Sequence, residues 1–305
     1  MLSVEKISFS YGKSKTITDL SLNVKQGEYL AVVGESGSGK STLLKLIYGE
    51  FDVEEGTVSW NESQVLGPKN KLVVGHEFMR YVSQEFDLMP YTTVRENIGT
   101  YLSNFFPKEK EKRIKELLEV VELEKFSNTK VKLLSGGQKQ RVALAKAIAK
   151  KPEIILLDEP FSHIDNFKKQ SLRKNLFQFL KSENIACIVA THDKNDVLAF
   201  ADQMLVLHHG KVLLKDTPRA LFENPSHVLV AAFFGDYCVL DGIIYYAHQI
   251  KLSEQGSIKA QVKHSYFQGA HYLIEAETNS QTVYFNHPSA LEEKRTVSLE
   301  IKTNL

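Results

Sequence analysis

One short segment near the N-terminus constrains the fold more than any other part of the chain. The apolar run Tyr29–Val33 reads as a strand, the glycine-rich Gly34–Thr42 follows it, and Leu43–Tyr48 continues as a helix that ends at Gly49. This order of strand, loop and helix surrounds one small space with backbone N–H groups and the positive end of a helix. The segment therefore predicts a phosphate-binding loop.

The residues of this loop have separate expected tasks. The glycines let the backbone turn tightly, Lys40 should reach the β- and γ-phosphates, and the Ser41 hydroxyl should ligate Mg²⁺. A chance glycine turn is the alternative, and the length of the pattern and its flanks argue against it. The residues expected to contact the nucleotide are Gly34, Glu35, Ser36, Gly37, Ser38, Gly39, Lys40, Ser41 and Thr42.

A second strand ends in two carboxylates. The buried-looking run Ile154–Leu157 leads into Asp158 and Glu159. Because ligands bind at the carboxyl ends of parallel strands, these side chains should lie near the phosphate loop. Asp158 is expected to hold Mg²⁺ through water, and Glu159 to act as the base that activates the attacking water. Taken alone, the pair could be a solvated strand end.

The segment Lys132–Arg141, with the sequence KLLSGGQKQR, resembles the signature of the ABC ATPase family. It should begin a helix that runs to about Lys150, and free N–H groups at a helix start suit a γ-phosphate. The resemblance implies a homodimer, or another pair of cassettes, joined head to tail around two ATP molecules. The residues implied to contact ATP on the opposite subunit are Ser135, Gly136, Gly137 and Gln138. A serine-capped helix start would explain Ser135 but not the whole run.

Further single residues match the same family, and each alone would be an ordinary surface or core residue. The resemblance implies that Tyr11 stacks on adenine and that Gln84 meets Mg²⁺ or the water as a catalytic residue. It implies that His192 touches the γ-phosphate and helps to fix Glu159 and the water.

The loop Ser162–Asp165 also matches the family, in which it reaches across the dimer; Asp165 is therefore expected to contact nucleotide. Within this loop, His163 stands where the family usually has a small residue.

Strand-like and helical segments alternate from Leu2 to about Leu214, which predicts an α/β fold with apolar strands in a mostly parallel, buried sheet. Residues 1–235 are expected to form one nucleotide-binding domain. By resemblance this part is a P-loop NTPase of the ABC cassette type, with a mixed sheet and a helical subdomain at about 86–150. Residues 236–305 are rich in short β runs and predict a small OB-like β-barrel. The five expected strands are 241–246, 257–264, 272–277, 281–285 and 296–301. His208–Gly210 is read as a hairpin turn and Cys187 as a core residue.

Composition narrows the class of protein. The 38 Lys and Arg residues nearly balance 37 Asp and Glu residues, so nucleic acid is not expected as a partner. The longest apolar run, Val228–Phe234, is too short to span a membrane, and the N-terminus does not resemble a signal peptide. Cys187 and Cys238 form no metal or disulfide pattern. The family resemblance implies separate membrane-spanning subunits, so a peripheral protein on the cytoplasmic face of the cell membrane is expected.

The connector at 216–235 resembles that of importer ATPases with a C-terminal OB-like domain, a group that includes iron(III), polyamine and sugar importers. Transmembrane permease subunits and an extracytoplasmic solute-binding protein are the implied partners, and Phe86–Tyr91 is expected to contact the permease. Because the tail diverges from this group, the solute is left open. The role of the tail itself is interpreted as dimerisation or regulation. An exporter subunit and a soluble ATPase acting on nucleic acid or the ribosome remain alternatives.

Overall fold

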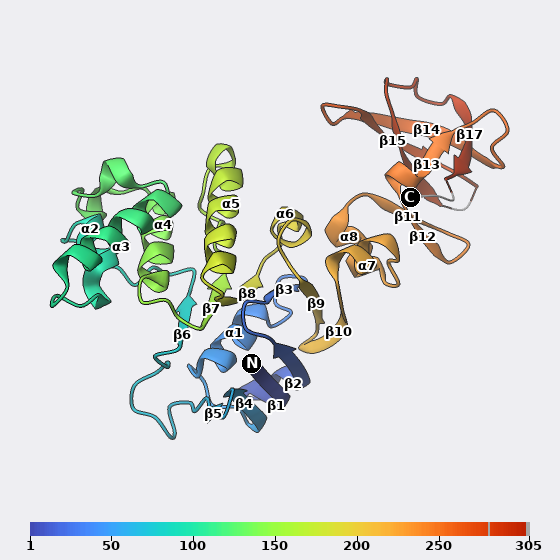
Figure 1. Ribbon diagram of the computed structural model, residues 1–305. Helices are drawn as coiled ribbons and strands as arrows, with labels where there is room; N and C mark the ends of the chain where they lie inside the picture. The colour runs from blue at the N-terminus through green and yellow to red at the C-terminus, as the bar shows by residue number, and fades with distance from the viewer. Residues whose placement is uncertain (280, 303–305) are drawn as a thin grey trace. The chain divides into compact units, whose positions relative to one another are not determined.

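The computed structural model describes residues 1–279 and 281–302. These residues form two compact units, which divide between Pro218 and Arg219 (Figure 1). Residues 219–235, assigned above to the nucleotide-binding part, are grouped with the second unit. The domain limits at residue 235 stay a prediction. No helix in the described ranges has the length and apolar character needed to cross a membrane.

The central sheet of the first unit has six strands in the order β10-β9-β3-β8-β7-β6. The neighbours from β9 to β6 are parallel, and β10 pairs antiparallel with β9 through a hairpin. The expected strands at Tyr29–Val33 and Ile154 onwards are confirmed. The strands are β3 (Tyr29–Val33), β6 (Met79–Val82), β7 (Ile154–Asp158), β8 (Ala186–Ala190), β9 (Gln203–His208) and β10 (Lys211–Asp216).

A second, antiparallel sheet in this unit was not predicted as a separate layer. Its strands pair in the order β2-β1-β4-β5, and the register between β1 and β2 shifts at several bulges. These bulges interrupt the alternation of apolar and polar residues from which a half-buried strand is recognised. The strands are β1 (Leu2–Tyr11), β2 (Ser14–Val24), β4 (Glu55–Trp60) and β5 (Ser63–Gln64).

The helices of the first unit fall into two groups. Figure 1 shows α2, α3 and α4 gathered in one lobe, where the sequence predicted a helical subdomain. The helix expected to begin after Ser135 is confirmed. The helices are α1 (Lys40–Tyr48), α2 (Val94–Ile98), α3 (Pro107–Val120), α4 (Gly136–Ile148), α5 (Asn166–Ser182) and α6 (Lys194–Leu198), with 3-10 turns η1 (Gly99–Tyr101), η2 (Glu124–Phe126) and η3 (Val131–Leu133).

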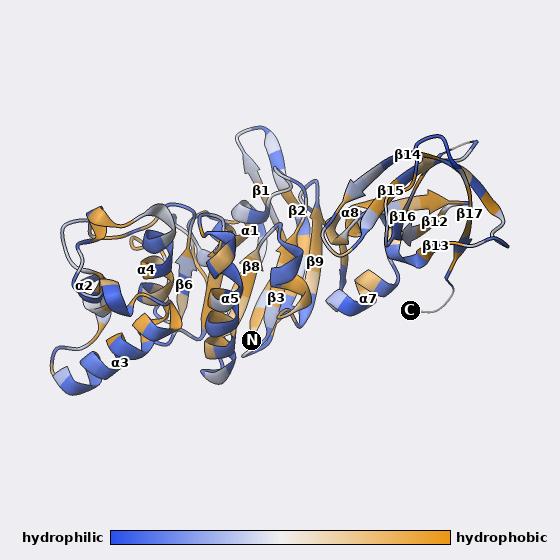
Figure 2. Cartoon of the chain, turned by 90° about the horizontal axis from the view of Figure 1, so that it is seen from above, coloured by the Kyte–Doolittle hydropathy of each residue, from blue (hydrophilic) through white to orange (hydrophobic). Residues whose placement is uncertain are grey.

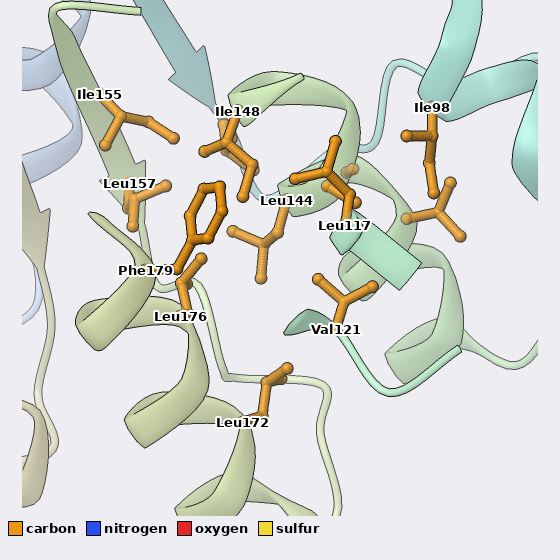
Figure 3. Packing of buried hydrophobic residues seen from close by; sticks show 14 of the residues in the cluster. Ile98, Leu117, Val121, Leu144, Ile148, Ile155, Leu157, Leu172, Leu176 and Phe179 are labelled. Carbon is orange, nitrogen blue, oxygen red and sulfur yellow. The ribbon is translucent and has the colours of Figure 1, made fainter. Parts of the chain in front are cut away.

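The central sheet is buried on both faces. Ile155 and Leu157 of β7 belong to a core shared with the helices of the lobe and α5, as Figure 3 shows. The intervening Ile154 and Leu156 belong to a second core with α1 and the antiparallel sheet. In Figure 2, β8 and β9 are coloured as hydrophobic, whereas α3 alternates hydrophilic and hydrophobic positions. Burial on two faces explains why these strands read as continuous apolar runs.

The second unit is a small β-barrel-like domain preceded by two short helices, and it fits the predicted OB-like class. The sequence predicted five strands, and the described residues of this unit form seven, in a two-stranded sheet β11-β12 and a five-stranded antiparallel sheet β13-β17-β14-β15-β16. The elements are α7 (Pro218–Glu223), α8 (Val228–Phe234), β11 (Tyr237–Leu240), β12 (Ile243–Tyr246), η4 (Ala247–Gln249), β13 (Ile250–Leu252), β14 (Ile258–Phe267), β15 (Tyr272–Glu277), β16 (Thr282–His287) and β17 (Thr296–Ile301).

The prediction of a strand at 241–246 was wrong at its N-terminal boundary, because β12 begins at Ile243. Asp241 and Gly242 have φ values of 50° and 78° and form the turn between β11 and β12. An Asp-Gly pair favours such a two-residue hairpin turn, and this signal places a strand on either side of it. The core of this unit is built from alternating side chains such as Val262, Ile274 and Phe285.

Candidate functional site

The phosphate loop lies between β3 and α1, as predicted. A Cβ atom on Gly34 would lie 2.2 Å from the backbone oxygen of Leu207, and one on Gly39, which has a φ of 105°, would lie 2.9 Å from Ile17. Both positions therefore require glycine. Lys40 Nζ lies along the loop and donates to the Gly34 and Glu35 carbonyls at 2.9 and 3.0 Å. Burial lowers the pKa of Lys40, and the carboxylates of Glu159 and Asp158 oppose this shift.

The turn between β9 and β10 supports this loop. His209 and Gly210 have φ values of 46° and 73°, so the predicted hairpin turn is confirmed. The Gly210 N–H donates to the Ser38 carbonyl at 3.1 Å, and its own carbonyl accepts from the Thr18 N–H at 2.9 Å. A Cβ on Gly210 would lie 2.1 Å from the Thr16 carbonyl oxygen. The turn thus joins the phosphate loop to β2, a role that its sequence does not reveal.

Asp158 ends β7 with its carboxylate buried. One oxygen, Oδ2, accepts a hydrogen bond from the Tyr81 hydroxyl at 3.2 Å. The other, Oδ1, is buried without a hydrogen-bond partner among the described residues. Burial and the neighbouring Asp158 raise the pKa of Tyr81, so its hydroxyl keeps its proton and remains a donor. Tyr81 was not singled out from the sequence, because a tyrosine on a strand gives no sign of its partner.

Glu159 follows Asp158 in an unusual backbone conformation. Its φ is 50°, a region that costs energy for a residue other than glycine. Its N–H donates to the Ala190 carbonyl at 3.0 Å. Its carboxylate Oε2 lies 2.8 Å from Nδ1 of His192, which follows β8. The Glu159 side chain is 15% exposed and that of His192 is 73% exposed, so the pair faces open space.

A buried glutamine on the signature helix holds the backbone of Glu159. Gln140 on α4 is 1% exposed, and its Nε2 donates to the Glu159 carbonyl at 3.0 Å. The Ser162 hydroxyl donates to the same carbonyl at 3.0 Å. The Ser162 N–H also donates to this carbonyl, at 3.2 Å. Four hydrogen bonds therefore hold the two peptide groups of Glu159, and this explains how the strained conformation persists. Gln140 lies inside the motif segment, but its role was not predicted.

The loop that carries His192 is anchored from α5. Thr191, next to it, is 1% exposed and donates to Asp196 Oδ2 at 2.7 Å. Arg173 forms ion pairs with Asp193 and Asp196. Burial raises the pKa of Asp196 to about 6, against the opposing effects of Thr191 and Arg173. This network fixes the backbone on both sides of an exposed histidine.

The predicted residues of several elements meet at one cleft with a volume of about 500 Å³. Thr16 on β2 lines it too and was not predicted. Glu35 and Ser38 belong to the phosphate loop but do not line the cleft, and neither do Tyr11, Asp165 or the segment Ser135–Gln138. The lining residues, within the described part of the chain, are Thr16, Gly34, Ser36, Gly37, Gly39, Lys40, Ser41, Thr42, Gln84, Asp158, Glu159 and His192.

The signature segment forms the start of α4, away from this cleft's lining. Ser135 caps the helix: its hydroxyl accepts from the Gln138 N–H at 3.3 Å, and the Gln138 side chain accepts from the Ser135 N–H at 2.9 Å. A Cβ on Gly136 would meet no atom within 4 Å, whereas one on Gly137 would lie 2.6 Å from the His163 carbonyl oxygen. Gly136 therefore presents its backbone to open space, and Gly137 packs within the chain.

Tyr11 lies at the end of β1 and belongs to an aromatic cluster. Its ring meets those of Phe9 and Phe51 edge to face, with centroids 4.9 and 5.6 Å away. Lys45 lies over the Phe51 ring at 5.4 Å. The Tyr11 side chain is exposed, so one face of the cluster is open to a flat ligand. Phe51 lies 40 positions further along the chain, and its sequence context gave no hint of this contact.

Comparisons with known proteins agree with this geometry. Residues 17–162 match the family model described as ABC transporter. The chain is 36% identical over 242 residues to the Fe(3+) ions import ATP-binding protein FbpC 2 of Haemophilus influenzae, covering 79% of this chain and 68% of that protein. It is 36% identical over 243 residues to the spermidine/putrescine import ATP-binding protein PotA of Legionella pneumophila, covering 79% and 66%.

Solved structures give the same result. The fold is similar, with a TM-score of 0.63 and 30% identity, to a dimeric post-hydrolysis state of the ATP-binding cassette MJ0796 bound to ADP and Pi, covering 71% of this chain and 98% of that one. A second match, cbiO1 from Clostridium perfringens, part of the ABC transporter complex cbiONQ, has a TM-score of 0.64 and 28% identity, covering 73% and 90%.

Fold and cleft together define a nucleotide-binding P-loop ATPase of the cassette type. The chain belongs to the ABC transporter family, as one of its ATP-binding, ATP-hydrolysing proteins.

The hairpin turn provides a first test. We expect Gly210→Ala to weaken ATP binding by about tenfold or more, because the new Cβ would displace the turn that holds the phosphate loop. Gly242→Ala is the matched control: its φ of 78° imposes a similar cost of about 1–2 kcal/mol, but its Cβ would meet nothing within 4 Å. The dissociation constant, measured with a fluorescent ATP analogue, should change only for Gly210→Ala. Equal affinities would contradict the supporting role of the turn.

Proposed function

We propose that this chain is the ATP-hydrolysing subunit of an importer, and that it drives solute uptake through separate membrane subunits by closing as a dimer on ATP. The observation that carries the proposal is the convergence of Lys40, Asp158, Glu159 and His192 on one cleft. The import function stated in the names of its relatives supports the direction of transport. Those names give different solutes, iron(III) and polyamines, so the solute is left unassigned.

The proposed roles follow from the geometry. Lys40 and the N–H groups of the loop bind the β- and γ-phosphates, and Tyr11 stacks on adenine. Glu159 accepts a proton from the attacking water at its carboxylate, and His192, 2.8 Å away, orients that carboxylate and contacts the γ-phosphate.

The cleft also fits Mg²⁺. Asp158 Oδ1 is a buried carboxylate oxygen without a hydrogen-bond partner among the described residues, and such an oxygen suits a hard cation. Ser41 and Gln84 line the same cleft and would complete the set of protein ligands. When bound, the ion would neutralise charge on the β- and γ-phosphates. Tyr81 holds the other Asp158 oxygen and so orients the carboxylate.

The proposed base leads to a direct test. Glu159→Gln keeps the size of the side chain but removes the proton acceptor, so we expect ATP turnover to fall by about 100-fold or more. ATP affinity should be kept, and the variant should elute as an ATP-dependent dimer in size-exclusion chromatography. Turnover close to that of the unmodified protein would refute the role of Glu159.

We propose that the signature residues complete the site of a second subunit. Neither Ser135–Gln138 nor Asp165 is among the described residues that line the cleft of their own chain. Gly136 has open space where a partner's phosphate would lie. The dimeric state of the related cassette bound to ADP and Pi supports this arrangement. In a head-to-tail dimer, each site combines the loop of one chain with the signature of the other.

Mixed dimers test the arrangement. Lys40→Ala and Gly136→Glu should each abolish turnover, the second because its carboxylate repels phosphate while its side chain finds space. When the two variants are co-assembled in equal amounts, about half of the dimers are mixed, and each mixed dimer has one intact site. We therefore expect about a quarter of the normal number of active sites. Lys40→Ala mixed with Glu159→Gln should regain nothing, since both defects lie on the same half of a site. If ATP turnover is recovered in neither mixture, the proposal of a shared site is contradicted.

A groove beside Gln84 is the proposed docking site for the membrane subunit. It has a volume of about 300 Å³, and the predicted partner-contacting stretch supplies Phe86 and Asp87 to its wall. Lys146 pairs with Asp87 at 3.2 Å and lies over the Tyr101 ring at 5.4 Å. Aromatic and charged side chains line the groove together, and this mixture suits an amphipathic helix from another protein. Because the groove adjoins the cleft, a partner seated there would respond when the cleft closes.

Purification from detergent-solubilised membranes tests the partner class. The full chain should co-purify with a multi-span membrane protein, identified by mass spectrometry. Asp87→Arg should reduce this recovery several-fold, because it reverses a charge that is 96% exposed at the groove. Glu119→Arg, an exposed charge reversal on α3, is the control. ATP turnover of both variants is measured in parallel. Recovery of ribosomes or DNA without a membrane protein would defeat the transporter proposal.

A further inference from the structure

One aromatic contact joins the docking groove to the loop beside the catalytic carboxylate. The Phe86 ring, on the groove wall, meets the His163 ring at 5.7 Å between centroids and an interplanar angle of 80°. Phe86 is partly buried against the core of the helical lobe, whereas His163 lies in the exposed loop after Glu159. The contact is therefore a direct link between two loops that are far apart in sequence.

From His163 the link continues to Glu159 through a buried side chain. The His163 N–H donates to Gln140 Oε1 at 3.2 Å. Gln140 Nε2 donates to the Glu159 carbonyl at 3.0 Å, so one amide group holds both peptides. The His163 carbonyl oxygen packs against Gly137, where a Cβ atom would lie only 2.6 Å from it. A displacement of His163 must therefore move Gln140 and, with it, the strained peptide of Glu159.

We propose that His163 is a positioning residue that couples occupancy of the groove to the placement of the Glu159 carboxylate. The proposal rests on the proposed function, because it needs Glu159 as the base and the groove as the docking site. A partner that shifts Phe86 would shift the His163 ring, and the Gln140 amide would pass this shift to Glu159. Loss of the ring leaves the backbone bonds but removes the contact with Phe86 and the 3.1 Å hydrogen bond between His163 Nδ1 and the Ser162 hydroxyl.

A mutant cycle on the full-length chain tests this coupling. We expect His163→Ala and Phe86→Ala each to lower kcat for ATP about three- to tenfold. This range corresponds to the interaction free energy of one aromatic pair. The KM for ATP and the unfolding midpoint should be unchanged. The double variant should be no slower than either single variant, because both remove the same contact. His163→Phe keeps an aromatic edge against Phe86 and should restore at least half of the lost turnover.

Controls separate this coupling from general effects. His271→Ala in the second unit and Phe105→Ala, an exposed ring in the helical lobe, should keep the turnover of the unmodified protein. If His163→Ala matches that turnover, if the single effects multiply in the double variant, or if His163→Phe fails to rescue, the coupling role is overturned. These results leave the proposed function intact, which fails separately if the unmodified protein hydrolyses ATP no faster than Lys40→Ala.

Discussion

The parallel register of β3, β8 and β7 is the constraint on which the site depends. Val32 pairs with Ala190, and Ala190 pairs with Asp158, so the three strands end at the same level. The phosphate loop, the His192 loop and the two carboxylates therefore leave the sheet side by side. Any slip of one strand would move its functional residue away from the others. The two hydrophobic cores resist such a slip, because each strand is buried on both faces.

The sequence indicated that several residues proposed to contact nucleotide share one sheet edge, but it did not indicate the residues that hold them in place. Lys40, Asp158 and His192 each follow an apolar strand, and chain order alone brings such positions to one sheet edge. Tyr81 and Gly210 could not be assigned, because their partners are set by sheet packing. The hydrogen bond from Tyr81 to Asp158 joins residues 77 positions apart, and no local pattern encodes that distance.

Prediction of the fold had a similar limit, because only elements with a strong local sequence signal could be recognised. Strands of the central sheet have strong local signals, since a strand buried on both faces must be apolar throughout. The antiparallel sheet of β1, β2 and β4 lacks them, because bulges near Val4 and Phe9 break the alternation. In the second unit, the Asp241-Gly242 turn was read as part of a strand, although its residue types favour a hairpin. Local turn chemistry would have recovered this boundary, whereas the pairing of short β13 with β17 depends on tertiary contacts.

The backbone of Glu159 shows how stability and function meet in this chain. A φ of 50° is unfavourable for glutamate, yet this turn aims the carboxylate at His192 and away from β7. Three elements hold the turn: β8 through Ala190, α4 through Gln140, and the following loop through Ser162. Because α4 also begins with the signature segment, one helix links the surface proposed to meet a second subunit with the backbone of the proposed base. Movement of that helix would therefore displace the Glu159 carboxylate without any change in the nucleotide contacts.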